Sequence, residues 1–145
     1  MAVDMASDSA QPVLEELDQE ECLRLIAPGG IGRIAFEDGE GPTVVPVNYA
    51  VDGESVVFRT SLEGRVNRSL LTAVPGGQVR AAFEVDAFEV GTHEGWSVLV
   101  RGGAHPLEGE EKERAVRVDP WPGGEREAWF SLSAAEVSGR RLRRP

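Results

Sequence analysis

The strongest constraint on the fold is a change of pattern after Ile26, where helical spacing stops at Pro28-Gly29-Gly30 and short alternating segments begin. Apolar and β-branched residues dominate these segments, and Asp38-Gly39 and Asp52-Gly53 supply tight turns between them. Pro46 cannot donate to a ladder, so its strand should be an edge there or be locally disrupted. The pattern predicts six to seven strands, drawn from Ile31–Phe36, Thr43–Val51, Ser55–Thr60, Val79–Val85, Gly95–Ala104, Ala128–Leu132 and Glu136–Leu142.

Short helices are expected beside these strands. Asp18 followed by Glu21 is similar to a capping box and predicts a helix start. The helical spacing there comes from Leu17, Cys22, Leu25 and Ile26. We interpret Cys22 as a core residue of this helix, because no cation lies near it in sequence to activate a thiol. Two further helices are expected at Arg65–Ala73 and Glu108–Val116.

The order of these elements predicts a mainly β protein, a closed antiparallel barrel of six to seven strands with short flanking helices. A length of 145 residues suits one domain. Residues 1–11 are polar and acidic and are expected to be a disordered tail. We therefore predict a single domain over residues 12–145.

Charge and composition exclude several classes of function. A formal net charge of −10 disfavours nonspecific binding to nucleic acid or to an anionic membrane. We interpret the basic tail as a solvated end or a contact between subunits; it consists of Arg140, Arg141, Arg143 and Arg144. The single cysteine excludes an intrachain disulfide, and there is no apolar run of membrane-spanning length and no signal-peptide pattern. These features predict a cytoplasmic protein.

Familiar catalytic motifs are absent from the sequence. There is no G-x-S-x-G elbow, H-E-x-x-H helix, Walker loop or G-x-G-x-x-G turn. His93 and His105 have no third ligand at metal-binding spacing, so no metal site is expected. Catalytic residues and the small-molecule substrate are therefore left unassigned.

One segment has the features of an anion site. The run from Phe58 to Arg65 passes from the end of a strand into an expected helix, whose first amides favour a bound anion. The hydroxyls of Thr60 and Ser61 are further donors. Ser61, Arg65 and Arg68 have the spacing of one helical face, and arginine binds phosphate in bidentate geometry. The alternative interpretation is a helix cap followed by solvated arginines.

Three stretches of the chain resemble the pyridoxamine 5′-phosphate oxidase-like, FMN-binding split β-barrel family, and in particular its short members that bind FMN or a deazaflavin. They are Gly41–Val51 followed by Phe58-Arg59-Thr60-Ser61 and Gly64-Arg65, then Trp96–Ala104, then Val137–Leu142. The resemblance extends from about Leu17 to Leu142 and implies a split β-barrel.

The resemblance also implies a cofactor site. The strand Val45, Pro46, Val47 and Asn48 would lie along a flavin ring. The phosphate would be held by Arg59, Thr60, Ser61 and Arg65. The partner subunit of a homodimer would contribute Trp96 and Ser97, because the family binds its cofactor between subunits. Trp121 would cover the ring.

Two departures limit what the resemblance implies. Val66 replaces a lysine that often follows the phosphate arginine in the family. The chain also lacks the longer C-terminal region of the vitamin-B6 oxidase, so oxidation of pyridoxamine phosphate is not expected. The expected function is an FMN-binding oxidoreductase that acts as a homodimer, since a bound flavin supplies the hydride chemistry.

Several alternatives stay open at this point. A deazaflavin-dependent reductase is one; acidic surroundings disfavour the polyanionic tail of that cofactor, so FMN is placed ahead of it. A carrier, sensor or haem-binding module without turnover is another. The last is an interaction domain that has lost its cofactor.

Overall fold

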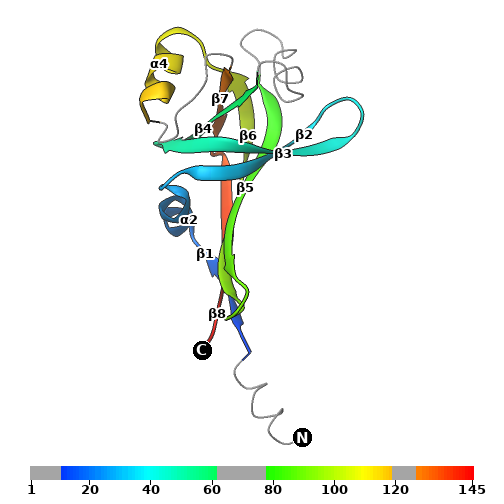
Figure 1. Cartoon of the computed structure of the whole chain (residues 1–145), viewed down its shortest axis with the longest axis vertical. Coiled ribbons are helices and arrows are strands. Elements are labelled where there is room, and N and C mark those ends of the chain that lie inside the picture. The colour runs from blue at the N-terminus through cyan, green and yellow to red at the C-terminus, as the bar shows by residue number, and fades with distance from the viewer. Residues whose placement is uncertain (1–10, 62–77, 119–126) are drawn as a thin grey trace, which may run out of the picture.

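In a computed structural model, which describes residues 11–61, 78–118 and 127–145, the chain forms an antiparallel β-barrel with an arm of long strands (Figure 1). The two described helices are α2 (Gln19–Ile26) and α4 (Gly109–Val118). The strands are β1 (Val13–Leu17), β2 (Gly30–Glu37), β3 (Pro42–Asp52), β4 (Ser55–Ser61), β5 (Val79–Glu89), β6 (Glu94–Pro106), β7 (Glu127–Ser133) and β8 (Glu136–Arg143). The expected helix at residues 65–73 lies outside the described residues.

The barrel is of the split type because β6 pairs with two different strands along one of its edges. The sheet order is β1-β8-β6-β5-β2-β3-β4-β7, and a further pairing of β6 with β7 closes the six strands from β6 to β7 into a ring. Along one edge, β6 pairs first with β8, as far as Arg101 opposite Glu136, and then with β7, from Ala104 opposite Leu132. The prediction of a mainly β, split antiparallel barrel is confirmed, with β1 and β8 as two strands outside the ring. These two strands and the adjoining hairpin of β5 and β6 form the arm (Figure 1).

The strand that the sequence analysis missed is β1. It pairs with β8 at the other end of the chain, with Val13 opposite Arg143 and Leu17 opposite Gly139. Placing Leu17 in the first helix was wrong, because Asp18 caps that helix by accepting a hydrogen bond from the Glu21 amide at 2.8 Å. Two acids in a five-residue strand hide its periodicity, and its pairing is not local.

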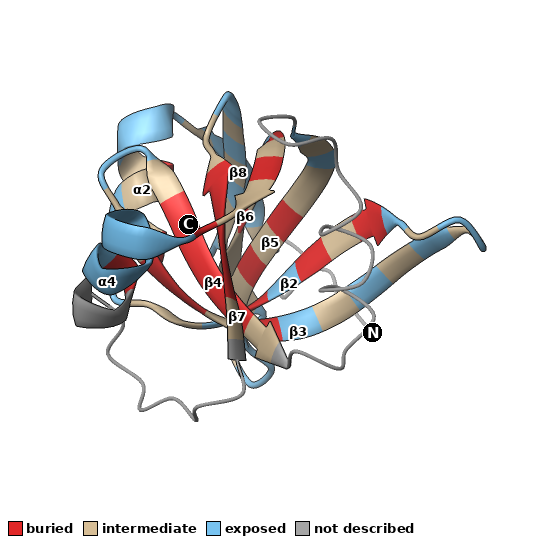
Figure 2. Ribbon diagram, turned by 90° about the horizontal axis from the view of Figure 1, so that it is seen from above, coloured by how far each residue is buried: buried red, intermediate tan, exposed pale blue. Residues whose placement is uncertain are grey.

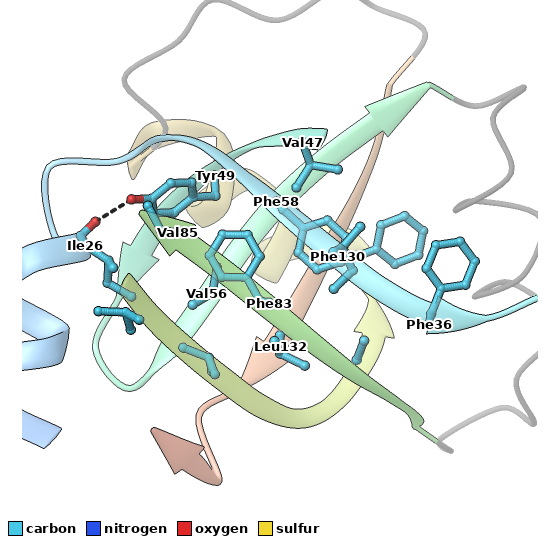
Figure 3. Packing of buried hydrophobic residues seen from close by; sticks show 14 of the residues in the cluster. Ile26, Phe36, Val47, Tyr49, Val56, Phe58, Phe83, Val85, Phe130 and Leu132 are labelled. Carbon is cyan, nitrogen blue, oxygen red and sulfur yellow. Dashed lines mark hydrogen bonds between the residues drawn. The ribbon is translucent and has the colours of Figure 1, made fainter. Parts of the chain in front are cut away.

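Inward-facing residues of the strands form the main core. Buried and exposed bands alternate along the strands as expected for a sheet with one face in the core (Figure 2). Phe58 and Phe130 stack with ring centroids 5.5 Å apart, and Phe83 lies edge-on to Tyr49 (Figure 3). The Tyr49 hydroxyl donates to the Ile26 carbonyl at 2.9 Å, which ties α2 to the barrel.

A second, smaller cluster lies on the outer face of β3, β4 and β7, where α4 packs. It consists of Ala50, Val57, Leu107, Ala115 and Trp129. At the other end of β3, Pro46 pairs with Arg33 of β2, whereas the β4 partner of β3 begins only at Asn48. The prediction that the strand is an edge at Pro46 is confirmed for the described part of the sheet.

Candidate functional site

Arg59 is the best-defined cation of the predicted site. It lies on β4 opposite Asn48 of β3 and Trp129 of β7, and residues paired in this way share a face of the sheet. Its side chain is 5% exposed, and its guanidinium lies over the Trp129 ring at 5.8 Å from the centroid. The register therefore brings the expected phosphate arginine next to the expected ring strand.

The rest of the predicted phosphate segment is only partly described. β4 continues to Ser61, which pairs with Glu127. Ser61 is therefore a strand residue, and placing it on one helical face with Arg65 was wrong, because its backbone pairs with β7. Thr60 follows Arg59 in the strand, so the two side chains point to opposite faces. Arg65 and Trp121 lie outside the described residues.

The expected ring strand presents two faces. Val47 is buried and Val45 packs against the main core, so both side chains face inward. Pro46 is exposed and Asn48 is half-buried, on the outer face. Only Pro46 and Asn48 can offer side chains to a ligand there, and Val45 and Val47 can offer backbone groups.

Trp96 and Ser97 also lie on opposite faces, because they are neighbours on β6. Trp96 is half-buried and packs against the core of its own chain. Ser97 is on the outer face, the same face as Asn48. Since β5 and β2 lie between β6 and β3, three strand spacings separate the two residues, roughly 14 Å or more. One chain alone does not bring Ser97 to the ring strand.

Ser97 lines a groove on the outer face that the sequence analysis did not predict. The groove has a volume of about 410 Å³, and its lining residues are Glu16, Leu17, Ser97, Leu99, Val137, Ser138, Gly139 and Arg140. They come from β1, β6 and β8. The groove depends on the pairing of β1 with β8, which the sequence pattern did not reveal.

On the same outer face, Arg33 of β2 bridges two carboxyl groups of β5. Its Nη1 lies 2.8 Å from Oε1 of Glu84 and 3.2 Å from Oδ2 of Asp86. Partial burial, and then the hydrogen bond and charge of Asp86, raise the pKa of Glu84 to about 6, although Arg33 opposes the shift. The cluster is therefore proton-sensitive near neutral pH.

This raised pKa predicts a pH dependence of stability. The folded pKa of Glu84, about 6, exceeds the ordinary value of 4.5, so the folded protein binds this proton more tightly than the unfolded chain. The stabilisation is complete below pH 4.5 and is lost as the pH rises through 6. We expect wild type to lose stability relative to Glu84→Gln between about pH 5 and pH 7. Urea unfolding of both proteins across this range measures it; a constant difference would contradict the prediction.

The basic tail is largely engaged within the chain. β8 carries three of its arginines alongside β1 and the β5–β6 turn. Arg141 pairs with Glu21 at 3.1 Å, Arg143 pairs with Glu15, and Arg144 donates to the Thr92 carbonyl at 2.7 Å. These contacts anchor the tail to the arm.

The described residues offer neither a metal site nor a membrane-spanning helix. No group of three potential metal ligands occurs among them. No helix in that part of the chain is long and apolar enough to span a membrane. A cytoplasmic location stays a prediction of the sequence.

Comparison with known proteins assigns the family. The family described as pyridoxamine 5′-phosphate oxidase matches residues 18–141, most of the chain. This protein belongs to the pyridoxamine 5′-phosphate oxidase family. The resemblance stated from the sequence is thereby confirmed.

Individual relatives of this family member are similar along most of its length. It is 29% identical over 139 residues to the uncharacterized protein Rv0080 of Mycobacterium tuberculosis, covering 94% of this chain and 91% of that protein. A FAD-binding protein of Mycobacterium smegmatis superposes with a TM-score of 0.72 at 28% identity, over 90% of this chain and 98% of the other.

A protein of Mycobacterium smegmatis that is described as heme-binding also has this fold. It superposes with a TM-score of 0.66 at 21% identity, over 81% of this chain and 51% of the other. Proteins of this fold thus differ in the group that they are described as binding, so the fold of this family member does not by itself decide its cofactor.

Proposed function

We propose that this protein is a flavin-nucleotide-binding oxidoreductase that works as a homodimer. The observation that most supports it is Arg59, a buried cation held in register with Asn48 of the strand expected to lie along the ring. Arginine binds phosphate through charge-assisted hydrogen bonds, and the guanidinium of Arg59 also lies over the Trp129 ring. A phosphate next to this position fits the donor set.

The parts of the site would divide the work of binding. Arg59, with Arg65 from the sequence prediction, would hold the phosphate by charge-assisted hydrogen bonds. Pro46 and Asn48 would position the ring from the outer face of β3, with backbone groups of Val45 and Val47. A bound flavin supplies hydride transfer, so the chain needs to orient and shield it more than to provide a catalytic triad.

The outer face of the sheet is the surface through which we propose that two copies of the chain associate. Large apolar side chains are exposed there: Ile31 is 60% exposed, Val44 62% and Phe88 59%. Register places each of them on the same side as Asn48 and Ser97. A second copy laid on this face would bury them and would bring its own Ser97 near the ring strand. The site would be incomplete without that copy.

FMN is our first choice of cofactor, and FAD is the second candidate because a 28% identical relative is described as binding FAD. Both contain the ring and first phosphate that the proposed site would hold. The deazaflavin coenzyme is placed below them, because its polyanionic tail would meet a chain with a net charge of −10.

Cofactor titration of Arg59→Gln tests this proposal. Wild type should bind FMN with a flavin absorption band and should have the mass of a dimer in light scattering. Arg59→Gln should weaken FMN binding by about 1.5–3 kcal/mol, the contribution of a hydrogen bond to a charged group. Riboflavin lacks the phosphate, so its affinity should change much less.

Arg101→Gln is the matched control, because Arg101 is paired with Glu136 at 3.7 Å and lies away from β4. It should leave both affinities unchanged. Equal losses of FMN and riboflavin in Arg59→Gln would show that Arg59 acts through folding. A haem spectrum, no cofactor affinity or a monomer mass at micromolar protein would reject the corresponding part of the proposal.

A further inference from the structure

The side chains around the groove on the outer face are arranged in rows by cross-strand pairing. Pairing across the arm places Asp86, Ser97, Arg140 and Glu16 in one row, on β5, β6, β8 and β1. The next row contains Glu84, Leu99 and Ser138. Residues of one row share a face, so charged, hydroxyl and apolar groups meet on one surface.

The groove lies where β1 ends. β1 ends at Leu17, opposite Gly139, whereas β8 begins three residues earlier, at Glu136. From Glu136 to Ser138, β8 pairs with β6 on one side and with no described strand on the other. The edge of β8 is therefore open there, within the described residues. The groove at this edge has a volume of about 410 Å³, within the range of small-molecule sites.

Arg140 distinguishes this groove from the rest of the arm. The neighbouring tail arginines Arg141, Arg143 and Arg144 each contact a partner within the chain. Arg140 lines the groove, and no ion pair or hydrogen bond of its side chain is found within the described residues, although Glu16 lies opposite it. A cation is thus available beside the hydroxyls of Ser97 and Ser138.

We propose that this groove binds a small monocarboxylate with an apolar body. Arg140 would hold the carboxylate, Ser97 and Ser138 would add hydroxyl donors, and Leu99, which shares their face, would contact the apolar body. Arg140 is the one cation among the residues that line the groove, and Glu16 lies opposite it, which favours a monoanion over a phosphate dianion. The groove includes Ser97, the residue expected to approach the partner's ring, so we assign this ligand as the substrate class, an assignment that rests on the proposed function.

Binding of a charged and a neutral probe tests the proposal. The full chain, without added flavin, is titrated with 2-naphthoate and with 2-naphthamide, which has the same body and no charge, and amide NMR shifts give the affinities. Naphthoate should bind more tightly and should shift the amides of Ser97, Ser138 and Arg140. Because Arg140 is exposed, Arg140→Gln should weaken naphthoate about three- to fivefold and leave naphthamide unchanged.

Two further variants sharpen the test. Glu16→Gln removes a like charge and should tighten naphthoate binding, the opposite sign to Arg140→Gln. Arg101→Gln removes a cation of the same face that Glu136 already pairs, and should change neither ligand. Equal naphthoate affinities in wild type and Arg140→Gln, or shifts confined to other strands, would overturn the proposal.

The experiment separates this proposal from the proposed function, because its readout needs no flavin. Naphthoate binding in a protein that fails to bind FMN or FAD would support the groove and reject the flavin. Flavin binding without naphthoate binding would reject the groove alone.

Discussion

Replacing Gly102 by alanine should destabilise the protein by about 3 kcal/mol, because overpacking against a rigid backbone has a large cost. A Cβ atom at this position would lie 1.8 Å from the carbonyl oxygen of Ser133. Gly102 follows Arg101, the last residue of β6 to pair with β8, and precedes Ala104, where the pairing with β7 begins. Relieving the clash would separate β6 from the β7–β8 turn. The pairing of β6 should therefore be destabilised at the point where its partner changes from β8 to β7.

Gly91→Ala is the matched control for this change. A Cβ at Gly91 meets nothing within 4 Å, so the same added methyl should change the unfolding free energy by less than about 1 kcal/mol. Urea unfolding measures both variants. Equal effects of the two substitutions would show that Gly102 is not constrained by close approach.

Removing the Phe83 ring should have an effect of similar size. Phe83 is fully buried, and its ring lies 5.0 Å from the Tyr49 ring, so Phe83→Ala should cost about 3–5 kcal/mol through lost burial and a cavity. Its ring also covers Gly32, where an added Cβ would lie 2.2 Å from Cζ. Gly32→Ala alone should therefore destabilise too.

The two changes should compensate when they are combined. Without the Phe83 ring, the methyl of Gly32→Ala has room, so the double variant should be more stable than the sum of the single losses predicts, by about 0.5–3 kcal/mol. A thermodynamic cycle from urea unfolding measures this coupling. Strict additivity would mean that the ring does not exclude a side chain at Gly32.

The sequence alone determined the features that depend on neighbouring residues. Alternation located the strands from β2 to β8, although β5 was predicted to end at Val85 and continues to Glu89 in the structure. Asp18 was identified as a helix cap from its spacing to Glu21, and Asp52-Gly53 as the turn before β4. Turn residues, caps and side-chain period are local properties, which is why they are visible in one sequence.

Part of the candidate site was visible in the same way. The segment from Phe58 to Arg65 was identified as an anion site from its place at a strand end. The resemblance added Arg59 as a phosphate ligand and the ring strand. That Arg59 and Asn48 lie opposite each other follows from the short turn at Asp52-Gly53, which fixes the register of β3 and β4. The helical placement of Ser61 failed because its pairing with Glu127 comes from a distant strand.

Only the tertiary structure decided the features that need contacts between distant segments. The pairing of β1 with β8 joins the two ends of the chain, and it creates the groove beside Arg140. The change of partner along β6, near Gly102, and the two strands that separate Ser97 from Asn48 are likewise set by ring closure. Local propensity does not specify which distant edges meet, because burial of the whole core selects that pairing.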